Sequence, residues 1–243
     1  MTERPIIFNA EMVRAILNGR KTQTRRIVNW RGVNEGLNLQ FSGLRACEEP
    51  NGWVIESNTR TSSEWRCQPT PCPFGAVGDR LWVRETWSDV NSEGCSAVAY
   101  RADSDIRLLA EMETFRDEGG ELNTADPRLE KYWFAAWSSD LFSGTEGSWR
   151  PSIHMPRWAS RIMLEIIGMR VERLQDISQA DAIAEGAPPS HPSIDTVSSD
   201  YGFSDFSRSW FGQTWWSIYG QESWLANPWV WVIEFKHIGG GAA

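Results

Sequence analysis

The segment from Asn9 to Arg26 constrains the fold most, because it joins a short amphipathic helix to an extended basic run. Asn9 is a favourable N-cap, and apolar residues between Met12 and Leu17 recur on one helical face. Gly19 stands where a left-handed C-terminal cap belongs. We therefore predict a helix that is followed at once by an extended segment.

The extended segment carries an unusual density of hydroxyl and cationic groups. Alternation along a strand places Thr22, Thr24 and Arg26 on one side, and Lys21, Gln23 and Arg25 on the other. Together with Arg20, these groups suit an anionic or strongly polar ligand. The alternative is that basic residues at a helix C-terminus are favoured by the helix dipole alone.

Composition limits the class of protein. The 243 residues suffice for one elaborated domain, which we place at residues 1–238, with insertions at about 31–72 and 102–150 and a disordered tail at 239–243. The net charge is −8, whereas residues 1–32 alone carry +5. This balance argues against nonspecific coating of nucleic acid and favours a small anionic ligand or a nucleoside at a focused basic site.

Neither a membrane-spanning window nor the apolar core of a signal peptide is present in the sequence, so we expect a cytoplasmic protein that has no membrane partner. Four cysteines are too few for a disulfide scaffold in a chain of this length. Cys67 and Cys72, with Cys47, have spacing unlike the usual zinc hairpin. We expect no metal and no cofactor, and the sequence leaves a role of these cysteines open.

A turn at Gly78-Asp79 precedes a clear strand pattern. Leu81, Val83 and Glu85 alternate with Trp82 and Arg84. Trp82 and Arg84 are candidates for contact with a ligand. The alternative is that the aromatic ring lies in the core and the charged group faces solvent.

Further elements follow in the C-terminal half of the chain. We expect strands at 161–166, 169–174 and 228–235, a helix at 178–186, a loop at 187–203, and a helix from 204 or 205 to Gly220. The helix at 178–186 begins with a variant capping box of Ser178 and Asp181 and ends at Gly186. Glu185 lies in its last turn, where the helix dipole disfavours a carboxylate.

Four of these features occur in the same order in a known family. The motif Gly19-Arg20-Lys21-Thr22-x-Thr24-x-Arg26, the Gly78-Asp79 turn before a strand, the Glu185 helix and the Val-Ile-Glu-Phe ending resemble the ASCH domain. The resemblance implies an α+β fold, namely a PUA-like mixed β-barrel with short flanking helices, here with a large irregular insertion. The longer form of the Gly78-Asp79 strand looks like that of phage or prophage members.

The best understood enzymes that this chain resembles are the small bacterial N4-acetylcytidine amidohydrolases. The resemblance implies that Lys21, Thr24 and Glu185 are catalytic and that Arg20, Thr22 and Arg26 contact the substrate. Lys21 would act as base, Thr24 as nucleophile and Glu185 as acid for the departing amine. Alternatively, water is the nucleophile and Thr24 only positions the substrate. The chain departs from those enzymes in its greater length and in Arg25, where they usually carry an apolar residue.

Three other functions stay open at this point. The same residues suit a non-catalytic module that binds RNA or a modified base, or an ASCH-type ribonuclease that uses Lys21 and Arg26 on phosphate. The acidic segment 102–146 suits contacts with a partner protein. We place the amidohydrolase first.

Overall fold

The computed structural model describes residues 1–33, 39, 43–57, 66–129, 135–188, 192–200 and 202–239. The fold is α+β with mixed parallel and antiparallel strand pairs, as expected. The sheets of the described residues are open, so these strands do not close into the expected barrel. The chain divides into two compact units, and the prediction of one elaborated domain stays a prediction.

The first unit combines Met1–Asn18, Arg80–Glu165 and the C-terminal residues from His237. Strand β1 (Glu3–Ile7) pairs parallel with β5 (Arg80–Arg84), and β5 pairs antiparallel with the first residues of β9 (Met163–Arg173). Helix α1 (Ala10–Leu17) begins where expected, because Asn9 Oδ1 accepts a hydrogen bond of 2.9 Å from the Met12 amide. The strand expected after the Gly78-Asp79 turn is thus confirmed as β5.

A three-stranded meander forms the rest of this unit. It consists of β6 (Trp87–Ser92), β7 (Cys95–Tyr100) and β8 (Ile106–Leu108). Short helical turns follow: η1 (Leu109–Glu111), η2 (Glu113–Phe115), α2 (Ser138–Ser143), η4 (Ser152–His154) and η5 (Arg157–Ala159). A buried cluster that includes Trp87, Tyr100 and Phe115 joins the meander to these turns. The predicted insertion at 102–150 therefore contributes to a core.

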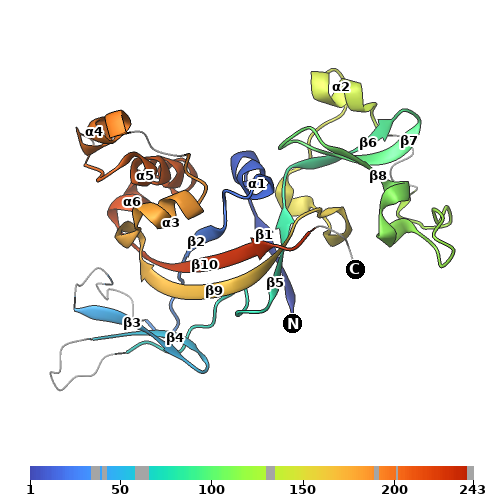
Figure 1. Cartoon of the computed structure of the whole chain (residues 1–243). Coiled ribbons are helices and arrows are strands. Elements are labelled where there is room, and N and C mark those ends of the chain that lie inside the picture. Colours follow the sequence, from blue (N-terminus) through green and yellow to red (C-terminus); the bar gives the residue numbers. More distant parts are fainter. Residues whose placement is uncertain are drawn as a thin grey trace. The chain divides into compact units, whose positions relative to one another are not determined.

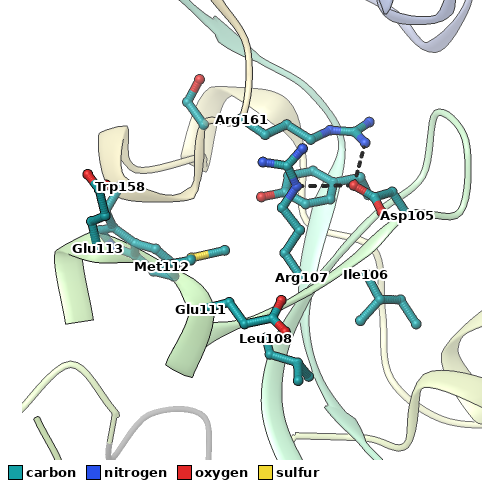
Figure 2. A pocket seen from close by; sticks show the side chains of 11 residues that line it. Asp105, Ile106, Arg107, Leu108, Glu111, Met112, Glu113, Trp158 and Arg161 are labelled. Atoms are coloured by element: carbon teal, nitrogen blue, oxygen red, sulfur yellow. Dashed lines mark hydrogen bonds and ion pairs between the residues drawn. The ribbon is translucent and has the colours of Figure 1, made fainter. Parts of the chain in front are cut away.

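The first unit also contains a cavity of about 490 Å³. Residues of β8, of the turns η1 and η2 and of the segment from Trp158 to Arg161 line it (Figure 2).

The second unit combines Gly19–Asp79 and Ile166–Lys236. Strand β10 (Trp229–His237) lies between β9 and β2 (Gln23–Ile27), with Ile233 opposite Thr24. Strands β3 (Leu44–Glu49) and β4 (Gly52–Ser57) form a separate hairpin within the segment 31–72, which the sequence marks as an insertion. The helices are η6 (Leu174–Asp176), α3 (Gln179–Ala184), α4 (Pro192–Asp200), α5 (Phe206–Tyr219) and α6 (Gln221–Leu225). Figure 1 shows α3, α5 and α6 on one side of β9 and β10 and the hairpin on the other.

The core of the second unit lies between its helices and β10. Phe211 and Trp215 on α5 pack with Ala182 on α3 and with Val230 and Val232 on β10. Burial of a large apolar side chain stabilises a fold by roughly 1.5–3 kcal/mol. This packing therefore fixes α3, and with it Glu185 at its end, against the sheet.

Two sequence-based expectations for this region are wrong. The loop at 187–203 contains α4, which begins with Pro192, a residue well suited to the first helical turn. The two strands at 161–166 and 169–174 are one strand, because Gly168 does not interrupt it. A Cβ on Gly168 would lie 2.8 Å from Glu234 Oε2, so the glycine permits close approach to β10.

Other expectations concern metals, membranes and the tail. Among the described residues, no group of three or more potential ligands is placed to hold a metal ion, and Cys67 Sγ instead accepts a hydrogen bond of 3.2 Å from the Ile55 amide. A search of the same residues finds no helix with the length and apolarity needed to cross a membrane. Residues 240–243 of the expected disordered tail lie outside the described residues.

Candidate functional site

The basic motif and the end of α3 are joined residue by residue. Arg20 Nη1 donates to Gly186 O at 3.0 Å, and the Thr22 amide donates to Ala184 O at 2.8 Å. Between them, Lys21 Nζ donates to Glu185 O at 2.9 Å. Two helix ends, one after α1 and one after α3, therefore bring the motif and Glu185 together inside the second unit.

Lys21 and Glu185 form a buried ion pair. Lys21 Nζ lies 2.5 Å from Glu185 Oε2, and the residues are 2% and 4% exposed. Burial lowers the pKa of Lys21 below its ordinary value of 10.5, although the Glu185 carboxylate acts in the opposite direction. A lysine whose charged form is disfavoured in this way gives up its proton more readily than an exposed lysine does.

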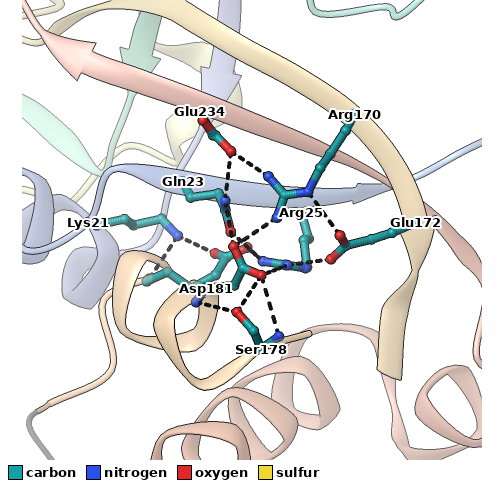
Figure 3. Close-up of polar contacts among 9 residues, drawn as sticks. Lys21, Gln23, Arg25, Arg170, Glu172, Ser178, Asp181 and Glu234 are labelled. Carbon is teal, nitrogen blue, oxygen red and sulfur yellow. Dashed lines mark hydrogen bonds and ion pairs between the residues drawn. The ribbon is translucent and has the colours of Figure 1, made fainter. Parts of the chain in front are cut away.

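A wider network holds this pair from the side of β2 that carries Gln23 and Arg25 (Figure 3). Arg25 Nη1 lies 3.4 Å from Glu185 Oε1, and Arg25 Nη2 lies 2.5 Å from Glu172 Oε1 on β9. Gln23 Nε2 donates to Asp181 Oδ1 at 3.1 Å. Arg25 is thus a buried cation between carboxylates of β9 and α3, and this surrounding accounts for a charged residue inside the unit.

Asp181 connects the network to the start of α3. It completes the expected capping box with Ser178, whose Oγ donates to Asp181 Oδ2 at 2.7 Å. Arg170 Nη2 on β9 donates to Asp181 Oδ1 at 2.8 Å. Although burial alone raises the pKa of Asp181, hydrogen bonds from Ser178 and Gln23 and the charge of Arg25 lower it to about 2. The carboxylate is therefore ionised throughout the physiological range.

Thr24 is buried in β2 but lies on the other face of that strand. Gln23 and Arg25 both reach Asp181, so the alternation of side chains directs Thr24 away from this carboxylate. The backbone of Thr24 pairs with Ile233 of β10. Thr24 is thus close to Lys21 in sequence but separated from the Arg25 network by the strand itself.

The remaining predicted contact residues of the motif are more accessible. Arg20 and Thr22 are exposed and flank the buried Lys21. Arg26 is half-buried, and its Nη1 lies 3.4 Å from Tyr219 Oη at the end of α5. The motif therefore presents exposed polar groups around a covered amine.

Trp82 and Arg84 belong to the first unit. The Arg84 guanidinium lies 4.9 Å from the centre of the Trp82 ring, and its Nε donates to Met155 O at 3.1 Å. Trp82 is buried. These contacts give both residues a role within the first unit, and their expected contact with a ligand stays a prediction.

Sequence reasoning missed the partners Arg170, Glu172 and Asp181 as parts of the site. Arg170 and Glu172 alternate along the strand at 169–174, so a common face could be foreseen. For Asp181, the sequence indicated only a part in the capping box of a helix. Nothing in the local sequence indicated that these carboxylates would surround Arg25, because that contact joins positions about 150 residues apart.

Comparisons of the chain with protein-family models, with curated proteins and with solved structures gave no match. The likeness to the ASCH domain therefore rests on the quoted motifs alone.

Proposed function

We propose that this chain is an ASCH-type, PUA-like amidohydrolase that removes the acyl group from N4-acetylcytidine or a related acylated nucleoside. The observation that carries the proposal is the contact of 2.5 Å between Lys21 Nζ and Glu185 Oε2. The two residues are 164 positions apart in the chain, and the motif resemblance assigns both of them to one reaction independently of this contact.

The proposed chemistry uses the proton that the two residues share. Amide hydrolysis requires a base for the nucleophile and an acid for the departing nitrogen. With its pKa lowered by burial, Lys21 passes its proton to Glu185 and becomes a neutral amine. The amine then takes a proton from the attacking water, and the Glu185 carboxyl group protonates the departing amine. The acyl group leaves as a carboxylic acid.

Water is the proposed nucleophile rather than Thr24. The side-chain alternation of β2 supports this choice, because it directs Thr24 away from the face on which Arg25 contacts Glu185. Arg20, Thr22 and Arg26 are assigned to substrate contacts on the motif resemblance, with Arg26 holding the oxyanion or the pyrimidine carbonyl.

The test is release of cytidine from N4-acetylcytidine, measured by chromatography for the parent chain, Lys21→Ala and Glu185→Gln. Loss of a general acid or base typically lowers turnover by roughly 10²–10⁴-fold. Thr24→Val should retain turnover if water is the nucleophile. Asp126→Asn is the matched control, because it removes a carboxylate from an Arg128 ion pair in the other unit. A folded parent that releases no cytidine contradicts the proposal.

A second candidate function is binding of RNA or a modified base without catalysis. It is favoured by the complete burial of the Lys21 side chain, which leaves Arg20 and Thr22 as the exposed groups of the motif. A binder would lose affinity in graded steps in Arg20→Gln and Thr22→Val, with no product formed. Salt-sensitive cleavage of RNA, without action on the free nucleoside, would instead indicate a ribonuclease.

A further inference from the structure

The cavity of the first unit has an unusual arrangement of charge. Its volume of about 490 Å³ lies within the range of small-molecule sites. Both arginine and carboxylate side chains line it, together with Trp158, Met112 and Leu108. Which of these charges are already neutralised decides what the cavity can bind.

Arg161 is fully occupied by the protein. Its Nε donates to Glu85 at 2.9 Å, Nη1 donates to Asp103 and Asp105 at 2.8 and 2.9 Å, and Nη2 donates to Glu85 and Asp103 at 2.9 and 2.8 Å. All five N–H donors of this guanidinium therefore have carboxylate acceptors. Arg161 fixes the wall and offers no donor to a ligand.

Arg107 is different. Within the described part of the chain, only its Nε is used, in an ion pair with Asp105 at 3.2 Å, and the side chain is 40% exposed. Figure 2 shows Arg107 extending from β8 into the space between Asp105 and the side formed by Trp158 and Met112. Asp105 also accepts a hydrogen bond from Arg161 Nη1, so the negative charge of Asp105 is shared by two cations. The two Nη groups of Arg107 therefore suit the carboxylate of a ligand.

Two negative charges face the same cavity, Glu111 from η1 and Glu113 from η2. Glu111 is exposed and lines the wall below Arg107 in Figure 2. Among the described residues no ion pair joins Arg107 and Glu111, so the two groups are more than 4 Å apart. Opposite charges that line one cavity without neutralising each other match a ligand that carries both charges.

We propose that this cavity binds a small zwitterion of the α-amino-acid type with an apolar side chain. Arg107 receives the ligand carboxylate, Glu111 receives the ammonium group, and the side chain packs on Met112, Leu108 and Trp158. The site lies wholly within the first unit and is independent of the Lys21–Glu185 pair.

The test is calorimetric titration of the full chain with leucine, N-acetylleucine and leucinamide, which carry both charges, only the negative one and only the positive one. We expect the chain to bind one leucine. Each singly charged analogue should bind at least about tenfold more weakly than leucine, because it loses a charge-assisted hydrogen bond. A folded parent that binds no leucine, or binds all three compounds equally, overturns the proposal.

Two variants assign the charges. Arg107→Gln should weaken leucine binding about tenfold and leave leucinamide binding unchanged, whereas Glu111→Gln should weaken leucine binding and leave N-acetylleucine binding unchanged. In Arg107→Gln, Asp105 keeps its hydrogen bond from Arg161, so the cavity wall stays in place. Glu111 is exposed, so Glu111→Gln should not affect folding. Arg45→Gln, an equal change of charge in the other unit, is the control. An equal loss of binding in this control overturns the proposal.

Discussion

At the scale of single residues, the Lys21–Glu185 pair combines proximity with exclusion from water. Removing two charges from water costs several kcal/mol each, and a buried pair regains this only through close contacts and further hydrogen bonds. Lys21 also donates to the Glu185 carbonyl, and Arg25 lies on the other carboxylate oxygen. Such a pair adds little net stability, so its presence needs a reason other than stability.

Loss of one partner is therefore expected to be more harmful than loss of both. Lys21→Met should lower the free energy of unfolding by about 3 kcal/mol, because Glu185 keeps a buried charge with only Arg25 beside it. The double variant Lys21→Met with Glu185→Leu should recover much of this loss. Urea unfolding of the three chains measures both changes. A double variant as unstable as the single one would contradict this view of the pair.

Asp181 gives a prediction for pH. Its pKa lies at about 2 in the folded chain and near 3.8 when unfolded, so the folded state favours the charged form. The resulting stability is present above pH 3.8 and is lost as pH falls from there to about 2. We expect about 1–2 kcal/mol from this group, with allowance for its partial exposure. Asp181→Asn should flatten this part of the pH profile of unfolding, and an unchanged profile would argue against the shift.

At the scale of elements, glycines permit approaches that a side chain would prevent. Gly52 begins β4 with φ of +127°, and a Cβ there would lie 2.6 Å from the backbone carbonyl of Thr70. Gly144 also has positive φ, +76°, but nothing within 4 Å of its Cβ position. A side chain at Gly144 would suffer only backbone strain, whereas one at Gly52 would also collide with Thr70.

Gly52→Ala should therefore destabilise the chain more than Gly144→Ala. We expect about 1 kcal/mol for Gly144→Ala, from backbone conformation alone, and clearly more for Gly52→Ala. Thermal unfolding of both variants measures the difference. Equal losses of stability in the two variants would mean that the β3–β4 hairpin shifts away from Thr70 at no cost in free energy.

Elements with complete local signals could be predicted from the sequence, and elements fixed by distant contacts could not. Asn9, Ser178 and Asp205 cap α1, α3 and α5 as their sequences indicate. The helix α4 has weak amphipathic character, and Asp195 in its first turn accepts a bond from the Phe206 amide, a contact that no local pattern reveals. The candidate pair was found through motif resemblance, whereas the carboxylates around Arg25 depend on the packing of β9 beside β10.

At the scale of the whole molecule, charge limits nucleic-acid binding. The chain carries −8 overall, so the basic motif is a local exception on an acidic protein. We expect affinity for nonspecific duplex DNA at physiological salt to be no tighter than roughly 10⁻⁴ M, the weak end of nonspecific binding. Fluorescence anisotropy with a labelled duplex measures it, and micromolar binding would contradict the expectation.

The pairing of β2 with β10 has a consequence during synthesis of the chain. Among the described strands, β10 is the only neighbour of β2, and it ends at His237 of 243 residues. The basic motif is therefore synthesised long before its strand partner. Until β10 is made, the edge of β2 that will pair with it is open. Unpaired strand edges promote aggregation of unfinished chains. Nascent chains that stop before residue 229 should therefore depend on chaperones, and chains that include β10 should not.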